Sequence, residues 1–140
     1  MYIYNKTIME IKQEWKQIRD LNYEASIHGE IRNLKTGRII KQRVSTDGYL
    51  ITDIQINKKN KTFKTHRLIA ETFYGIPDEG LQVDHINRIK TDNRVENLRW
   101  VTIKENLENR FFGVSEDTIK KIISLHSEGK TISEIFNKIN

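Results

Sequence analysis

Glycine-containing pairs divide the first half of the chain into short segments in which apolar and polar residues alternate. The pairs are His28-Gly29, Thr36-Gly37 and Asp47-Gly48, and the segments around them cover residues 23–27, 30–35, 38–44 and 49–56. Alternation with a period of two suits strands, and Asp-Gly favours a tight turn because both residues tolerate positive φ. This half of the chain therefore predicts an antiparallel β-sheet, with residues 57–61 as a charged hairpin tip.

Apolar residues recur every three or four positions in the second half, which is the spacing of amphipathic helices. We expect one helix over residues 64–74 and another over residues 102–112, with Thr102 as the N-cap of the latter. Between them, residues 81–86 and 98–101 have the pattern of two strands on either side of a polar stretch.

The last residues predict a separate pair of short helices. Ser115 caps the first, whose apolar face is Ile119, Ile122, Ile123 and His126. Thr131 opens the second with Glu134 in a capping box, and its apolar face is Ile132, Ile135, Phe136 and Ile139. The pair resembles the start of a helix-turn-helix without its third helix. We expect this tail to pack, to dimerise or to touch DNA backbone only, and a truncated chain is an alternative.

These elements predict an α+β fold in three parts. A β-rich N-terminal region with its following helix covers residues 1–77, a strand–strand–helix module covers 78–113, and the helical pair covers 114–140. The net charge of +5 favours a polyanionic partner such as nucleic acid. The chain has no cysteine and no apolar run long enough to span a bilayer, so we expect a cytoplasmic protein without thiolate metal sites.

A dense polar cluster around Asp84-His85 is the best candidate for chemistry. Hydrolysis of a phosphodiester needs a base for the attacking water and a cation that stabilises charge on the phosphoryl oxygens. His85 suits the base, while Asp84 and Asn106 offer the oxygen ligands that a hard cation prefers. Neighbours on a regular strand face opposite ways, so both can serve one site only if the chain twists there or they straddle the strand edge. Taken alone, such a pair is more often structural than catalytic.

The order of the motifs resembles the HNH endonucleases of the ββα-metal fold, in particular the phage and intron-encoded homing type. The resemblance rests on Asp84-His85, on Asn97 leading into Leu98-Arg99-Trp100-Val101-Thr102, and on Asn106. Residues 65–73, 14–18 and 47–50 also resemble segments of these proteins, so the similarity covers roughly residues 12–112.

The resemblance implies a role for each matching residue. His85 becomes the general base, Asp84 and Asn106 bind one divalent cation, and Asn97 either orients His85 or braces the loop. Asn106 stands where many members have histidine, which favours Mg²⁺ or Mn²⁺ over Zn²⁺. The loop at residues 87–90 lacks the usual Asp-Gly, so we expect its turn to differ locally. His66 lies on an apolar helix face and is expected to be a satisfied core histidine.

The expected partner is double-stranded DNA, because a basic antiparallel ribbon can enter the major groove. The candidate DNA-binding residues are Arg38, Lys41, Arg43, Lys58, Lys59, Lys61, Arg67, Arg94 and Arg99. Each of them could instead be a solvated surface charge. One base and one metal per chain predict a monomer that nicks one strand at preferred sites, and a double-strand break would need two copies. The alternative function is DNA binding without catalysis on an HNH-like scaffold.

Overall fold

The computed structural model describes residues 14–110, 115–131 and 134–135. The chain forms two compact units, Met1–Trp100 and Val101–Asn140, and each has its own apolar core. No helix in the described parts of the chain is both long enough and apolar enough to cross a membrane.

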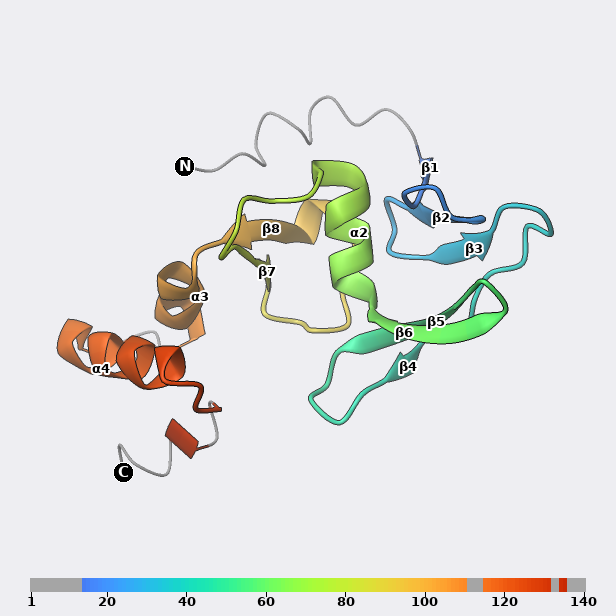
Figure 1. Ribbon diagram of the computed structural model, residues 1–140. Coiled ribbons are helices and arrows are strands. Elements are labelled where there is room, and N and C mark those ends of the chain that lie inside the picture. Colours follow the sequence, from blue (N-terminus) through green and yellow to red (C-terminus); the bar gives the residue numbers. More distant parts are fainter. Residues whose placement is uncertain (1–13, 111–114, 132–133, 136–140) are drawn as a thin grey trace. The chain divides into compact units, whose positions relative to one another are not determined.

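Short strands in the first unit form two antiparallel sheets of three strands each (Figure 1). The first sheet contains β1 (Trp15–Gln17), β2 (Tyr23–Ser26) and β3 (Ile31–Asn33), and the second contains β4 (Arg43–Val44), β5 (Leu50–Ile56) and β6 (Lys59–Lys64). Along β5, Thr52 and Ile54 are buried while Asp53 and Gln55 are exposed, which is the alternation expected of a strand with one covered face.

Two expected boundaries in this region are wrong. The segment over residues 38–44 is a strand only at Arg43–Val44, apart from a single bridge between Ile39 and Arg32. The hairpin tip is only Asn57 and Lys58, with φ values of 50° and 63°, so Lys59 and Lys61 belong to β6. Two consecutive residues with positive φ match the twist of the flanking strands, and pairing therefore resumes at once after the turn.

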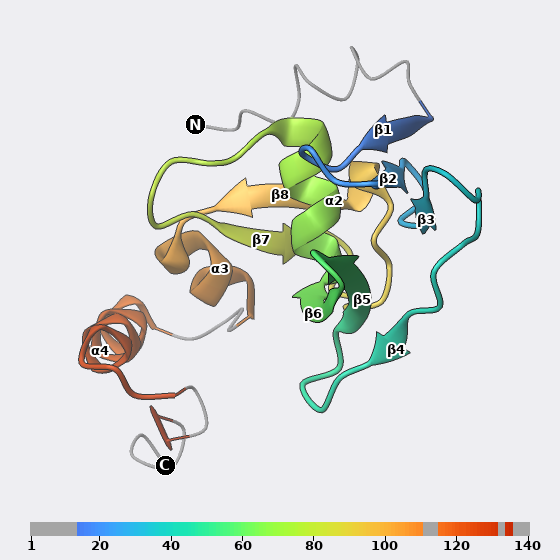
Figure 2. The same ribbon diagram turned by 45° about the vertical axis from the view of Figure 1, so that its right-hand side comes forward.

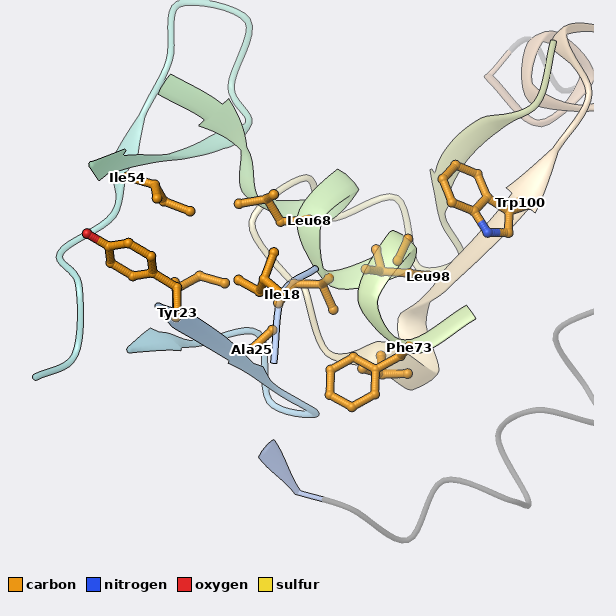
Figure 3. Close-up of a cluster of buried hydrophobic side chains, with 12 residues drawn as sticks. Ile18, Tyr23, Ala25, Ile54, Leu68, Phe73, Leu98 and Trp100 are labelled. Atoms are coloured by element: carbon orange, nitrogen blue, oxygen red, sulfur yellow. The ribbon is translucent and has the colours of Figure 1, made fainter. Parts of the chain in front are cut away.

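Helix α2 (Thr65–Tyr74) follows β6 directly and is central to the first unit. It contacts β1, β2, β5, β6 and β7, and Figure 2 shows it running across the β7–β8 pair. Its buried face includes Leu68, Ile69, Ala70 and Phe73, which meet Ile18, Tyr23, Ala25, Ile54, Leu98 and Trp100 in one apolar cluster (Figure 3). Gly75 ends the helix with a φ of 83°, a conformation that glycine adopts without strain.

The strands β7 (Gln82–His85) and β8 (Leu98–Val101) form a two-stranded sheet, with a 3₁₀ turn, η1 (Val95–Asn97), immediately before β8. Residues 86–94 connect the two strands and are called the β7–β8 loop below. The mixture of antiparallel sheets and helices confirms the α+β class.

The second unit contains α3 (Ile103–Arg110) and α4 (Glu116–Ser127), which pack around Leu107, Ile122 and Ile135. The predicted caps are present. The backbone N–H of Glu105 donates to the Thr102 hydroxyl, that of Thr118 donates to Ser115, and Thr131 and Glu134 form the capping box. The expected contributions of Ile132, Phe136 and Ile139 to a second tail helix lie outside the described residues, as do the last residues of the helix expected over 102–112.

Candidate active site

His85 is the last residue of β7 and is buried, with 5% of its surface exposed. Its Nε2 lies 2.8 Å from Oδ1 of Asn93, a residue of the β7–β8 loop that is itself 3% exposed. With Oδ1 of Asn93 facing the ring, the imidazole proton lies on Nε2, because an amide oxygen only accepts hydrogen bonds. Nδ1 is then the nitrogen with the free lone pair, which is the form of histidine that can accept a proton.

Two aromatic side chains surround the His85 ring. The ring of His66, from α2, lies 5.2 Å from that of His85 in an edge-on arrangement, and the Tyr49 ring lies 5.8 Å from it. Burial lowers the pKa of His66 to about 3, so this imidazole is neutral at physiological pH. The expectation of a satisfied core histidine is wrong in one respect, because Nδ1 of His66 is buried with no hydrogen-bond partner in the described structure.

Asn97 braces the β7–β8 loop. Its Nδ2 donates to Oδ1 of Asn87 at 2.9 Å and to the carbonyl oxygen of Asp92 at 2.8 Å, and its Oδ1 accepts from the backbone N–H of Asn87 at 3.0 Å. The hydrogen bond to His85 comes from Asn93 instead. The loop turn is left-handed at Arg88, with a φ of 63°, where the expected glycine is missing.

Asp84 precedes His85 and faces a different neighbour. Its Oδ2 accepts from both Nε and Nη2 of Arg99 on β8, each at 2.8 Å, and both side chains are mostly buried. Asp84 thus lies beside a cationic side chain of β8, while the His85 ring lies beside the His66 ring of α2.

Asn106 belongs to α3 in the second unit, where its backbone N–H donates to the carbonyl oxygen of Thr102 at 3.0 Å. Its partnership with Asp84 in a metal site is therefore a proposal. One carboxylate and one amide oxygen fit a hard cation that keeps water ligands. Among residues 14–110, 115–131 and 134–135, no cluster of three or more His, Asp or Glu side chains could hold a metal.

The predicted DNA-binding residues fall into two groups. Arg43, Arg67, Arg94 and Arg99 form ion pairs with Asp53, Glu71, Asp92 and Asp84 respectively. The others are exposed, and no ion pair is described for them in this structure: Arg38, Lys41, Lys58, Lys59 and Lys61. Because Arg99 forms an ion pair with Asp84 and its side chain is mostly buried, it is the least accessible of these nine residues to a DNA phosphate.

Sequence reasoning missed Asn93 and Tyr49. Asn93 lies within the polar stretch that follows Asp84-His85, but neither its spacing nor its residue type distinguishes it from Asn87 or Asn97. Tyr49 lies far from His85 in the sequence, just before β5, and only the folding of the elements between them brings the two rings together.

Comparison with known proteins gives matches along most of residues 13–108. A family model described as HNH endonuclease matches residues 63–108, and one described as the NUMOD4 motif matches residues 13–55. The DNA endonuclease I-HmuI of Bacillus phage SP01 is 41% identical over 99 residues, covering 69% of this chain and 57% of that protein. The uncharacterized HNH endonuclease L245 of Acanthamoeba polyphaga mimivirus is 34% identical over 86 residues, which cover 61% of this chain and 26% of that protein. The chain thus spans between about a quarter and just over half of these curated relatives.

A solved structure described as "DNA binding and cleavage by the HNH homing endonuclease I-HmuI" has a similar fold. The TM-score is 0.65 at 39% sequence identity, and the match covers 80% of this chain and 68% of the other. The resemblance inferred from the motifs is confirmed. Since the match covers more than two thirds of the chain in that solved structure at 39% identity, this chain belongs to the HNH endonuclease family.

Proposed function

We propose that this protein is a metal-dependent DNA endonuclease that hydrolyses one phosphodiester bond per visit and so nicks DNA at preferred sites. The observation that carries the proposal is the buried contact between His85 and Asn93, because it holds the imidazole in the form that accepts a proton at Nδ1. Such a base, next to a carboxylate on the same strand, suits the activation of water.

In the proposed reaction, Nδ1 of His85 takes a proton from a water molecule and the water oxygen forms a bond to phosphorus. The bond from phosphorus to the leaving sugar oxygen breaks, and that oxygen takes a proton from solvent. Asp84 and Asn106 would hold one Mg²⁺ or Mn²⁺, which supplies positive charge that stabilises the phosphoryl and leaving oxygens when bound. Asn97 keeps the loop closed so that Asn93 stays in contact with His85.

Double-stranded DNA is the proposed substrate. The similar solved structure is described as binding and cleaving DNA, and the first unit of this chain carries exposed basic residues on β6 and on the segment before β4. One proposed base per chain supports cleavage of one strand by a monomer. The dispersed lysines and arginines suit contacts to the phosphate backbone, which position a protein on DNA without reading bases.

The test uses the purified full chain, a supercoiled plasmid that carries DNA flanking its gene, and Mg²⁺ or Mn²⁺. We expect the wild type to convert supercoiled plasmid into open circles, and His85→Ala to abolish this while DNA affinity stays within a few-fold. Equal cleavage by His85→Ala would show that another group is the base. If the wild type binds DNA but does not cut it with any of Mg²⁺, Mn²⁺, Co²⁺ or Zn²⁺, that result would favour the alternative function, DNA binding without catalysis.

A further inference from the structure

Two lysines from distant parts of the chain converge on the ring of Tyr49. Nζ of Lys64, at the end of β6, lies 4.7 Å from the ring centroid, and Nζ of Lys90, in the β7–β8 loop, lies 4.9 Å from it. Both distances are within the range of cation–π attraction. We call these two residues the Tyr49 lysine pair.

Asp47 holds the Tyr49 lysine pair in place. Its carboxylate forms an ion pair with Lys64, and its carbonyl oxygen accepts a hydrogen bond of 2.9 Å from Nζ of Lys90. The stem of Lys90 also passes close to Gly48, where an added Cβ would lie 3.4 Å from Cδ. The turn before β5 thus fixes two ammonium groups that would otherwise move freely.

The charges in this cluster do not balance. Hydrogen bonds from Lys64 and Ser45 hold the pKa of Asp47 well below its usual range, so the carboxylate stays ionised. One carboxylate nevertheless faces two ammonium groups, and no ion pair with a carboxylate is described for Lys90 within residues 14–110. Like charges held together are unfavourable unless an anion joins them.

The location of this excess charge suggests which anion joins it. The Tyr49 ring that carries the lysines lies 5.8 Å from the ring of His85 and 4.8 Å from that of His66. His66 is neutral because burial lowers its pKa to about 3, so the positive charge beside the proposed base comes from the lysines.

We propose that the Tyr49 lysine pair binds a backbone phosphate of the DNA strand next to the phosphodiester bond that is cleaved by water activated at His85. The proposal rests on the proposed function, because it assumes that DNA lies across His85. The pair positions the strand without reading bases, and each ammonium group replaces counterions that the phosphate releases. Lys64 and Lys90 add to the nine basic residues predicted from the sequence.

The test is the salt dependence of DNA binding by the full chain, measured without divalent metal so that no cleavage occurs. Loss of one phosphate contact makes the slope of log affinity against log salt shallower by about 0.9. We expect this full change for the double variant Lys64→Gln/Lys90→Gln, in which the affinity lost between 50 and 200 mM salt should be roughly 3.5-fold smaller than in the wild type. Each single variant should show part of this change, because the remaining lysine still contacts the phosphate. Lys90→Arg should keep the wild-type slope because it keeps the charge.

Two further variants separate phosphate binding from a structural role. Asp47→Asn removes the carboxylate that competes for Lys64, so the affinity should rise at low salt and the slope should not become shallower. Lys16→Gln, on β1 and exposed, is the matched control and should leave the slope unchanged. Lys64 makes no side-chain cap to α2, so Lys64→Gln is expected to fold even if Lys90→Gln does not.

If Lys64→Gln and Lys90→Gln both keep the wild-type slope while folded, the lysines only pin the turn and the proposal is wrong. That outcome is distinct from failure of the proposed function, in which the wild type never cuts DNA. A shallower slope in both variants supports the phosphate site whether or not cleavage is seen.

Discussion

Gly29 allows the turn between β2 and β3 to lie against the residue that holds His85. Its φ is 89°, and an added Cβ would lie 2.9 Å from both C and O of Asn93. Neighbouring bonds tie the same segments together, since the backbone N–H of Val95 donates to the carbonyl oxygen of Ile27 at 2.9 Å. Gly29→Ala should therefore shift Asn93 and, through it, the His85 imidazole.

Two costs follow from Gly29→Ala. A non-glycine residue in the left-handed region costs about 1–2 kcal/mol, and forcing a methyl group into a packed contact costs roughly 1–3 kcal/mol more. Gly37→Ala is the matched control, because its φ is 70° but an added Cβ there would meet nothing within 4 Å. The difference between the two variants isolates the contact with Asn93.

The assays are urea unfolding and the rate of plasmid nicking at saturating DNA. We expect Gly29→Ala to be less stable than Gly37→Ala by about 1–3 kcal/mol. Displacement of a catalytic group by a fraction of an ångström to 1 Å costs on the order of 10- to 100-fold in rate, so kcat should fall by that factor in Gly29→Ala with little change in KM. Equal kcat values in the two variants, at a temperature where both are folded, would refute the coupling from Gly29 to His85.

Three other predictions follow from the site. The pKa of His66 is about 3 in the folded protein and near 6.5 in the unfolded chain, so the unfolded chain binds a proton first as the pH falls. The folded state is therefore fully stable with respect to this group above pH 6.5 and loses stability as the pH falls towards 3. Between pH 7 and 4.5, the free energy of unfolding should drop by roughly 2 kcal/mol more in the wild type than in His66→Phe; equal drops would contradict this. Asn97→Ala removes three part-buried hydrogen bonds and should lower the free energy of unfolding in urea by about 2–4 kcal/mol, whereas the exposed control Asn60→Ala should lower it by less than about 0.5 kcal/mol. Arg99→Gln removes a cation from Asp84, so the Mn²⁺ affinity measured by calorimetry should rise about fivefold; weaker binding would mean that Arg99 chiefly orients the carboxylate.

Local patterns predicted most of the regular structure. The strands β2, β5, β7 and β8 lie where alternation or apolar runs placed them, and α2 begins within one residue of the expected start. The caps of α3 and α4 at Thr102 and Ser115 were also predicted correctly. These signals are local, because periodicity and capping depend on residues within a few positions of one another. The errors at residues 38–44 and 57–61 arose where strand pairing, and not composition, sets the boundary.

The residue types of the candidate site were likewise readable from the chain, since Asp84, His85, Asn97 and Asn106 follow one another in the family's order. Which groups surround His85 was decided by the tertiary structure. Asn93 reaches the imidazole because Asn97 closes the loop, while Tyr49 comes from the segment just before β5 and His66 comes from α2. Arg99 of β8 pairs with Asp84 of the neighbouring strand β7, and Lys90 contacts Asp47 over a separation of 43 residues. Sequence order therefore identified the candidate base and metal ligands, but the hydrogen bonds and charges around the base depend on contacts between distant segments, which only packing of the whole unit creates.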